Sequence, residues 1–537
     1  MNRLTYNPPL ATIELRLRSL LSAELYAAAW VDPSPATLIN VFHHLRTLRY
    51  ILTDYVPRPV AESPPIPGEV RYEWQQGTLL FTDLAGFTPL LEANAGHGRK
   101  GAQTLLEVLN AYFASMIEII SKSGGELLEF TGDAMLVQFP TGKRQQDTAR
   151  AVRAGLRMQR AMSAFNQIQT AVGSFSLGMR VGIHCGRYIT ADIGTPQRMV
   201  HVLLGQTVQQ AKQAEGAGQV GRVCVSQVAS DRLQEHFRFE PGKPGYWLVT
   251  DDLSDAQLGE YDMTLNRRRM PSTVLLDRSV AGLVREITDA TTLLEPLASY
   301  LPKPILKLLV ENADRRNIPP DFPKLAVMFV NLIGLPESVD DALPEEEVNL
   351  VTSFSSVFAR INAAVVARDG VLQKVTAHLN GSDMLIYFGV PNAHTDDAFR
   401  VASTAIAIRD IIATLRPPVV GGKQVTVYCQ IGLAHGPVFA TEVGEPRGRR
   451  EFNVLGDTVN TAARLMSQAA KNQILMTQAV YDLLTGQGSE AMSATGCTHH
   501  QPFLFEALGN LVLKGKTASI PVFTLQSQTT EPLSIVS

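Results

Sequence analysis

The sequence predicts an α+β protein in which one domain occurs twice behind a helical N-terminal segment. Three observations predict this class. Four segments recur in the same order about 250 residues apart. Each copy contains a run with helical spacing followed by two short apolar strands. Proline-rich stretches lie before the first copy and between the two copies, where linkers are expected.

The composition is that of an ordinary folded protein. The 537-residue chain has a net charge of −3, so it carries no basic excess for nucleic acid. Its four cysteines are scattered without a C-x-x-C pair, which fits a reducing compartment. No run of about 18 uncharged apolar residues occurs. The composition therefore predicts a cytoplasmic protein with no nucleic-acid partner and no membrane span.

Changes in composition divide the chain into four parts. Residues 1–70 form a helical segment that ends in the Pro-rich connector VPRPVAESPPIPGE, and residues 71–250 hold the first copy of the domain. A Pro-punctuated, partly helical linker covers 251–318, and the second copy covers 319–530. Within each copy a long helix is expected before the two strands; in the second copy it covers 347–368.

The first copy carries two aspartates at the ends of predicted strands. An apolar strand leads into FTDLAGFT, which contains Asp83, and the strands ELLEF and AMLVQF are joined by a turn that ends in Asp133. Two neighbouring strands could bring both carboxylates to one metal site, and the turn after Asp83 would offer backbone N–H groups to an anion. A strand that ends in an ordinary polar turn would also explain FTDLAGFT.

The second copy lacks both carboxylates. When LLFTDLAGF is set beside AVMFVNLIGL, Asp83 falls on Asn331. When TGDAMLVQF is set beside NGSDMLIYF, Asp133 falls on Ser382. The second copy is therefore not expected to hold a metal ion.

The second copy has an asparagine and an arginine at two positions where the first copy has glutamines. When VLLGQTVQQAKQ is set beside NVLGDTVNTAAR, Gln209 and Gln213 fall on Asn460 and Arg464. Asn460 and Arg464 are four residues apart and so share one helical face. A solvated helix face would also explain them, but a decayed duplication would not lose complementary halves in its two copies.

Together these motifs resemble the class III nucleotidyl cyclases, and the two-copy layout is similar to the catalytic head of the soluble adenylyl cyclases. The resemblance covers roughly residues 75–250 and 320–530. It implies two ferredoxin-like cyclase domains that pair within one chain as a pseudo-heterodimer with a single active site. It further implies conversion of ATP to 3′,5′-cyclic AMP and pyrophosphate with two Mg²⁺ ions, or with Mn²⁺, in intracellular signalling.

The resemblance assigns roles in the first copy to the metal and phosphate ligands. Asp83, Asp133 and the backbone carbonyl of Leu84 would hold the metal ions. Arg187 in HCGR would bind phosphate through its guanidinium. The backbone amides expected to cradle the phosphates belong to Ala85, Gly86, Phe87 and Thr88.

In the second copy the resemblance assigns the groups that complete the site. Asn460 would orient the ribose and Arg464 would stabilise the charge that develops on the α-phosphate. Lys514 in LKGK would contact the triphosphate. A lone lysine that points into water would equally explain Lys514.

Base recognition departs from the pattern of the family. Adenylyl cyclases usually carry a lysine just before the second metal position and an Asp or Thr seven residues before the asparagine. Here these positions hold His378, or Asn380 in an alternative alignment, and Asn453. The Glu and Cys that are usual for guanylyl cyclases are also absent. We expect ATP as substrate, with a guanylate cyclase as an alternative.

The degenerate pocket departs from the family as well. Soluble adenylyl cyclases can bind bicarbonate there through a lysine and an arginine, and the corresponding residues here are Glu129 and Lys212. A carboxylate disfavours an anion, so a Glu129–Lys212 salt bridge is expected instead of bicarbonate binding. The rival to an enzyme is a weak or inactive pseudo-cyclase that binds nucleotide and regulates a partner. Either protein would respond to an unknown regulatory protein or small-molecule effector.

Overall fold

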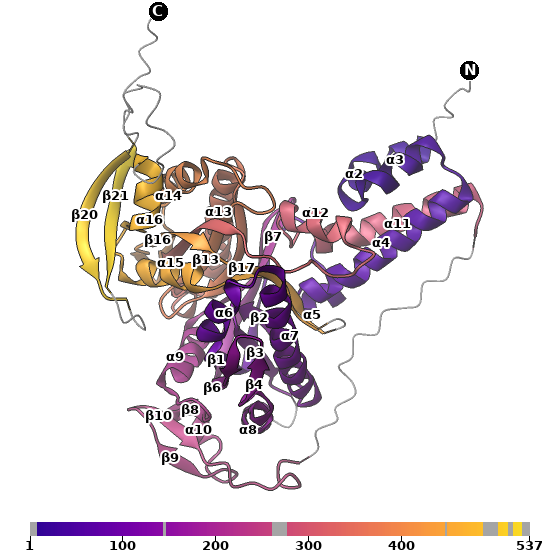
Figure 1. Cartoon of the computed structure of the whole chain (residues 1–537). Coiled ribbons are helices and arrows are strands. Elements are labelled where there is room, and N and C mark those ends of the chain that lie inside the picture. The colour runs from indigo at the N-terminus through magenta and orange to yellow at the C-terminus, as the bar shows by residue number, and fades with distance from the viewer. Residues whose placement is uncertain are drawn as a thin grey trace, which may run out of the picture. The chain divides into compact units, whose positions relative to one another are not determined.

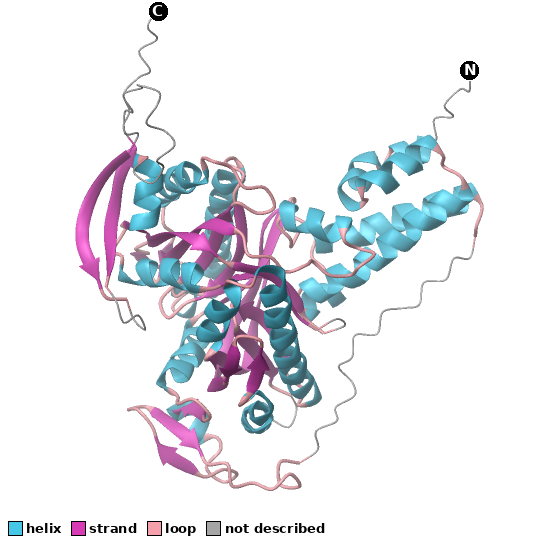
Figure 2. Ribbon diagram, in the orientation of Figure 1, coloured by secondary structure: helices cyan, strands magenta, loops and turns pink. Residues whose placement is uncertain are grey.

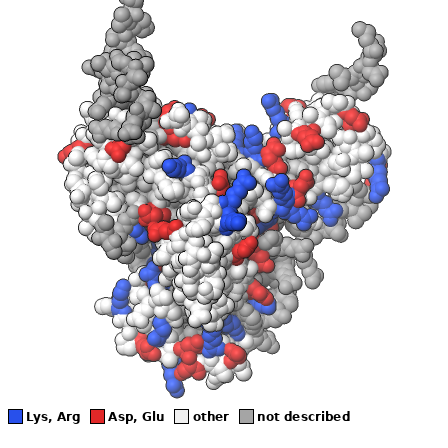
Figure 3. Space-filling view, viewed as in Figure 1, with Lys and Arg blue, Asp and Glu red and all other residues white. Residues whose placement is uncertain are grey.

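The computed structural model describes residues 8–142, 146–259, 277–445, 448–486, 503–513 and 519–528. The chain divides into two compact units. Unit 1 comprises Met1–His201, Gln210–Asp321 and Ala440–Asn453. Unit 2 comprises Val202–Gln209, Phe322–Phe439 and Val454–Ser537. Figures 1 and 2 show sheets covered by helices. On the face in view in Figure 3, the Lys and Arg side chains are interspersed with those of Asp and Glu.

The sheet of the first copy has the strand order β2-β3-β1-β6-β8-β10-β9, and β7 also pairs with β6. The central strands β1 and β3 pair antiparallel, as do β1 and β6, whereas β6 and β8 run parallel. The sheet is therefore mixed and mainly antiparallel. Its strands are β1 (Arg71–Ala85), β2 (Glu126–Thr131), β3 (Ala134–Pro140), β6 (Gly178–Thr195), β7 (Arg198–Leu204), β8 (Val223–Ser226), β9 (Phe239–Pro241) and β10 (Tyr246–Val249).

The helices of the first copy are α6 (Phe87–Ala95), α7 (Gly98–Lys122), α8 (Asp147–Ala161), α9 (Gln206–Ala217) and α10 (Gln227–Asp231). Helix α7 confirms the predicted helical spacing, because Leu105, Leu109, Tyr112 and Met116 are all buried. With a mean hydropathy of 1.3 over 18 residues, α7 is also the one described helix long and apolar enough to cross a membrane. Its buried face packs against β2, as expected of a core helix.

A helical module is formed by the N-terminal segment and part of the interdomain linker. Helix α4 begins after the capping residue Ser34, whose side chain accepts a hydrogen bond from the backbone N–H of Thr37. Helix α4 packs along α11, as Figure 1 also shows. The helices of this module, all in unit 1, are α1 (Pro8–Ala11), α2 (Glu14–Leu20), α3 (Ala23–Val31), α4 (Pro35–Tyr55), α5 (Arg58–Glu62), α11 (Val280–Ala298) and α12 (Lys303–Glu311).

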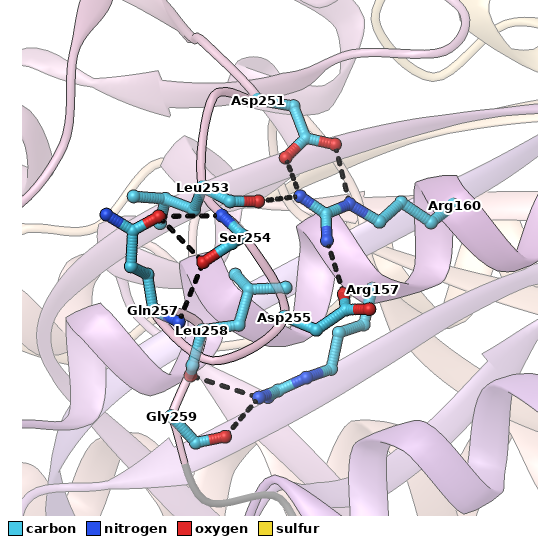
Figure 4. Close-up of polar contacts among 9 residues, drawn as sticks. All are labelled: Arg157, Arg160, Asp251, Leu253, Ser254, Asp255, Gln257, Leu258 and Gly259. Atoms are coloured by element: carbon cyan, nitrogen blue, oxygen red, sulfur yellow. Dashed lines mark hydrogen bonds and ion pairs between the residues drawn. The ribbon is translucent and has the colours of Figure 1, made fainter.

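The linker begins as a segment docked on α8 (Figure 4). Arg160 forms ion pairs with Asp251 at 2.5 Å and Asp255 at 2.7 Å. Arg157 donates to the carbonyls of Leu258 and Gly259 at 3.0 and 2.9 Å. Two arginines one helical turn apart thus fix residues 251–259 to the first copy.

Unit 2 repeats the sheet topology, with the strand order β12-β13-β11-β16-β19-β21-β20. This repetition confirms the predicted duplication. The strands are β11 (Lys324–Ile333), β12 (Val371–Ala377), β13 (Ser382–Phe388), β16 (Tyr428–Pro437), β19 (Ile474–Thr477), β20 (Phe503–Leu511) and β21 (Ile520–Gln528). The helices are α13 (Pro344–Val366), α14 (Asp397–Ala413), α15 (Asp457–Gln468) and α16 (Gln478–Thr485).

One hairpin of the second copy belongs mostly to unit 1. Strands β17 (Phe439–Gly444) and β18 (Arg450–Leu455) pair only with each other among the described strands, and residues 440–453 cluster with unit 1. Conversely, residues 202–209 of the first copy cluster with unit 2. There the backbone N–H of Gln206 donates to Asp340 at 2.6 Å.

Candidate functional site

Asp83 and Asp133 lie near one another in unit 1. Asp83 is close to the end of β1, and Asp133 is in the turn between β2 and β3. The β1–β3 ladder pairs Thr82 with Met135 and so brings the two strand ends together. Burial and, to a smaller extent, the Asp83 carboxylate raise the pKa of Asp133 to about 7. The predicted pair of carboxylates is therefore close enough to interact electrostatically.

Arg180 is the cation of this site. It lies opposite Asp83 in the β1–β6 ladder, and its guanidinium contacts the Asp83 carboxylate. Its Nε lies 2.9 Å from Oε1 of Glu215 on α9. Sequence reasoning missed both Arg180 and Glu215. The available signal was the position of Arg180 in MRVGIH, which an antiparallel pairing of the two strands would place opposite Asp83.

Arg187 does not belong to this site. It pairs with Gln76 in the β1–β6 ladder, seven residues along β6 from Arg180. At about 3.3 Å per residue this is about 23 Å along the strand. The Arg187 guanidinium instead stacks over the ring of Trp74, 4.3 Å from its centroid. The assignment of Arg187 to phosphate was wrong because it followed a motif, whereas strand register decides which arginine faces Asp83.

The turn after Asp83 presents the amides that the sequence predicts. Gly86 has a φ of 89° and precedes the first residue of α6, Phe87. A Cβ at Gly86 would lie 2.4 Å from the carbonyl oxygen of Ser176, so only glycine fits. No side chain caps the N-terminus of α6. The first amides of this helix, including Thr88, are thus suited to an anion.

The residues at this site fit a divalent cation. The Arg180 guanidinium contacts the carboxylates of Asp83 and Glu215, and Asp133 interacts electrostatically with all three residues. The described residues hold no cluster of three or more His, Cys, Asp or Glu side chains arranged as a complete metal centre. Mg²⁺ needs no such cluster, because it commonly takes one or two carboxylates and completes its shell with phosphate and water. The excess negative charge therefore fits Mg²⁺ carried in with a polyphosphate.

At the equivalent place in the second copy, Asn331 and Ser382 stand where the first copy has Asp83 and Asp133. Asn331 pairs with Gln430 in the β11–β16 ladder, as Asp83 pairs with Arg180. The Asn331 amide donates to the carbonyl of Asn380 at 2.8 Å and to Gln430 Oε1 at 3.5 Å. Ser382 is buried at the start of β13. Amide hydrogen bonds thus replace the ionic pair of the first copy, and the carboxylate nearby is that of Asp383, which pairs with Asn331 in the β11–β13 ladder.

Strand register identifies Lys374 as the counterpart of Glu129. The β2–β3 ladder pairs Glu129 with Leu136, and the β12–β13 ladder pairs Lys374 with Leu385. Leu136 and Leu385 each follow the second metal position, Asp133 or Ser382, by three residues. Glu129 precedes Asp133 by four residues, but Lys374 precedes Ser382 by eight. The hairpin of the second copy is therefore longer by four residues: its ladder has one more pair, Ala377–Ser382, and its turn covers 378–381 where the first copy has only 132–133.

His378 lies inside this longer turn and not at the lysine position. Its Nδ1 is 3.4 Å from the Asn331 amide, and its Nε2 is 3.8 Å from Asp383 Oδ2. The assignment of His378 to base reading was wrong because it counted back from Ser382 through the extra residues. The alternative Asn380 fails for the same reason. Strand register instead places Lys374 at the position in the second copy where an adenylyl cyclase is expected to have its lysine.

Asn453 lies in unit 1, although it belongs to the second copy. It is fully buried on β18, and its amide donates to the carbonyl of Gly132 at 3.3 Å. Gly132 immediately precedes Asp133. The predicted base-reading asparagine is thus adjacent to the turn that carries the second metal aspartate.

The remaining assignments concern residues of both units. Asn460 and Arg464 are partly exposed, one turn apart on α15 in unit 2, and their place opposite Asp83 stays a prediction. Lys514 lies outside the described residues. The Lys212 ammonium lies 5.7 Å from the centroid of the Phe81 ring, and its ion pair with Glu129 also stays a prediction.

Comparison with known proteins identifies the class that this fold and site define. The profile described as "Adenylate and Guanylate cyclase catalytic domain" matches residues 70–246 and 319–527. The chain therefore belongs to the adenylate and guanylate cyclase family and contains two catalytic domains of that family. The predicted resemblance to class III cyclases is confirmed.

Among curated relatives, the chain is similar to adenylate cyclase type 10 of Oryctolagus cuniculus, with 23% identity over 471 residues. That match covers 85% of this chain and 27% of the rabbit protein, so the chain spans about a quarter of this relative's length. An adenylate cyclase of Mycobacterium tuberculosis is 31% identical over 189 residues, 35% of this chain and 39% of that protein.

One solved structure shares the fold over most of the chain. It is a class III adenylyl cyclase-like ATP-binding protein from Pseudomonas aeruginosa, with 13% sequence identity and a TM-score of 0.51. The match covers 82% of this chain and 92% of that protein. The two-domain α+β fold predicted from the sequence is therefore confirmed.

Proposed function

We propose that this protein is a cytoplasmic adenylate cyclase that converts ATP into 3′,5′-cyclic AMP and pyrophosphate at one site shared by its two copies. The observation that carries the proposal is the hydrogen bond from Asn453 to Gly132, beside Asp133. Asn453 belongs to the second copy, which holds Asn460 and Arg464 but no metal carboxylates. A contact between that copy and the turn of the first copy supports a composite site.

The first copy would bind the metal ions and the triphosphate. Asp83 and Asp133 would hold two Mg²⁺ or Mn²⁺ ions, with the backbone carbonyl of Leu84 as a further ligand. When bound, these ions would acidify the 3′-hydroxyl and neutralise phosphate charge. Once Asp83 is engaged in this way, the Arg180 guanidinium is available for a phosphate oxygen. The backbone amides from Ala85 to Thr88 would hold a second part of the triphosphate.

The second copy would orient the nucleotide and stabilise the transition state. Asn460 would position the ribose, and Arg464 would stabilise the charge that develops on the α-phosphate as the 3′-oxygen attacks. Lys514 would add a contact to the triphosphate. Both Asn460 and Arg464 are partly exposed on α15 and are not among its buried residues.

Lys374 and Asn453 would read the base. Adenine offers an acceptor at N1 and a donor at its amine, which a lysine ammonium and an amide oxygen can satisfy. Guanine offers O6 and N1–H, which the same pair could meet after a small shift, so discrimination would be modest. The similarity to proteins named adenylate cyclases supports ATP as the substrate of this protein, and guanylate cyclase activity is the alternative.

A second candidate is a nucleotide-binding regulator without efficient turnover. The contact between Arg180 and Asp83 favours it, because an arginine that stays paired with a metal carboxylate would oppose cation binding. Turnover of purified protein with ATP and GTP, in Mg²⁺ and in Mn²⁺, separates these functions. Formation of cyclic AMP that is abolished in Asp83→Ala supports the cyclase, whereas nucleotide binding without any cyclic product identifies the regulator. A regulatory protein or small-molecule effector would control either one.

A further inference from the structure

A buried ionic network connects helix α4 of the helical module to the β17–β18 hairpin. Arg450 Nη2 lies 3.1 Å from Asp54 Oδ2, and Arg450 Nη1 lies 2.9 Å from Glu442 Oε1. The Tyr55 hydroxyl donates to Glu442 Oε2 at 2.5 Å. All four residues are less than 10% exposed, and all belong to unit 1.

The network holds the hairpin firmly because its charges are removed from water. A buried charge without its partner lowers the stability of the folded protein strongly. Separation of Asp54 from Arg450 therefore carries a large free-energy cost. Burial and the Glu442 carboxylate raise the pKa of Tyr55 well above its ordinary value, which keeps the phenol protonated as a donor. Arg450 Nη1 also donates to the carbonyl of Arg316 at 2.7 Å. If the end of α4 moves, the β17–β18 hairpin is therefore expected to move with it.

The neighbouring residue Arg449 connects the same helix to β2. Its Nη1 donates to the carbonyl of Asp54 at 3.2 Å, and its Nη2 donates to the carbonyl of Leu128 at 3.5 Å. Arg449 and Asn453 are four residues apart on an extended segment, so their side chains project from one face. Their backbone acceptors, Leu128 and Gly132, are also four residues apart. Residues 449–453 thus lie alongside β2, from Leu128 to the Gly132–Asp133 turn.

We propose that Asp54, Tyr55, Arg449 and Arg450 are positioning residues, through which helix α4 sets the place of Asn453 beside the Gly132–Asp133 turn. The helical module then acts on nucleotide affinity and base preference without touching the nucleotide. This inference rests on the proposed role of Asn453 in reading the base. An effector that moves α4 would alter the site through this route.

The structure offers a matched pair of variants for the test. Tyr55→Phe removes a 2.5 Å hydrogen bond to Glu442 on the hairpin. Tyr26→Phe removes a 2.5 Å hydrogen bond to Glu14 within the same helical module, away from the hairpin. The full-length protein is used throughout. The measurements are kcat and KM for ATP and GTP, and the dissociation constants of 3′-deoxy-ATP and 3′-deoxy-GTP, which lack the attacking hydroxyl.

For Tyr55→Phe we expect a rise of about three- to tenfold in the KM for ATP and in the dissociation constant of 3′-deoxy-ATP, the effect of one hydrogen bond. The preference for ATP over GTP should fall while kcat changes by less than about twofold. Tyr26→Phe should leave all these quantities unchanged. Asp54→Asn should resemble Tyr55→Phe, and Arg450→Lys should lose less affinity than Arg450→Met.

A double-mutant cycle with Asn453→Ala makes the test specific. Once the Asn453 amide is gone, Tyr55→Phe should cause no further loss of affinity or preference. Independent, additive effects would overturn the inference, and so would a lowered Tm with unchanged nucleotide affinity. Binding of 3′-deoxy-ATP without turnover of ATP would end the cyclase proposal alone, because the dissociation constants still test the positioning. Failure of the wild-type protein to bind either analogue would overturn both proposals.

Discussion

Arg180 and Asp83 face each other across the β1–β6 ladder, and the arginine contacts the aspartate carboxylate while its Nε lies 2.9 Å from Glu215. In the second copy, Asn331 and Gln430 occupy the positions of Asp83 and Arg180 in the corresponding ladder. The same ladder pair is thus polar in both copies, but it is ionic only in the first. The proposed catalytic asymmetry between the copies would follow from this difference.

Truncation of Asp133 in the first copy should reduce turnover far more than truncation of Ser382, its equivalent in the second copy. Asp133→Ala should lower kcat by about 100-fold or more, because it removes a charge needed to hold the catalytic cations. The matched variant Ser382→Ala changes the equivalent position of the second copy and should keep turnover near that of the wild type. Steady-state formation of cyclic nucleotide measures both. Equal losses in the two variants would contradict a single metal site in the first copy.

Substitution of the two arginines of β6, Arg180 and Arg187, should have different effects on the KM for ATP. Arg180→Gln should raise the KM for ATP about 10-fold or more, the cost of one charge-assisted hydrogen bond to phosphate. Arg187→Gln removes only the stacking on Trp74 and should leave KM unchanged. Initial rates over a range of ATP concentrations provide the measurement. A larger effect at Arg187 would restore the motif-based assignment.

Lys374 and His378 provide a test of the strand register in the second copy. Lys374→Met should reduce the ratio of kcat/KM for ATP to that for GTP by about three- to 30-fold, because it removes one charged donor to the base. His378→Ala should leave this ratio unchanged. In addition, Asn453→Asp should sharpen the preference for ATP, since a carboxylate accepts from the adenine amine and repels guanine O6. Insensitivity of the ratio to Lys374→Met would exclude this residue from base recognition.

The stability of the protein should fall in mild acid because of His184. Burial, with a smaller effect from Arg232, lowers the pKa of His184 to about 4, and its Nδ1 lies 2.7 Å from the Ser226 hydroxyl. The unfolded histidine has a pKa of about 6.5, so between these values the unfolded state binds more protons. The stabilising effect is complete above about pH 6.5 and is lost as the pH falls toward 4.

The expected loss at the low end is about 3 kcal/mol, since each unit of pKa shift corresponds to about 1.36 kcal/mol. Urea unfolding at pH 7 and pH 4.5 measures it. His184→Gln should flatten the pH dependence of the unfolding free energy, although it lowers stability at pH 7. An unchanged slope in this variant would show that other groups control acid stability.

The sequence by itself determined the features that depend on local pattern. Helix α7 follows from the spacing of its apolar residues, and the duplication follows from repeated segments. Asp83 could be recognised because it follows an apolar run near the end of β1, and Gly86 because a glycine marks the turn that comes next. Complementary losses between the copies then predicted a class III cyclase, which the family match confirms.

Tertiary structure decided the features that depend on which segments pair. Arg180 rather than Arg187 faces Asp83 because strand register, and not a motif, sets the partner across a ladder. Lys374 rather than His378 matches Glu129 because four extra residues in one hairpin shift every count made along the chain. Asn453 meets Gly132 across 321 residues of sequence, because the hairpin of one copy folds into the unit of the other. Contacts at such separations leave no periodic trace in the sequence, since each depends on the position of a whole element and not on the residues beside it.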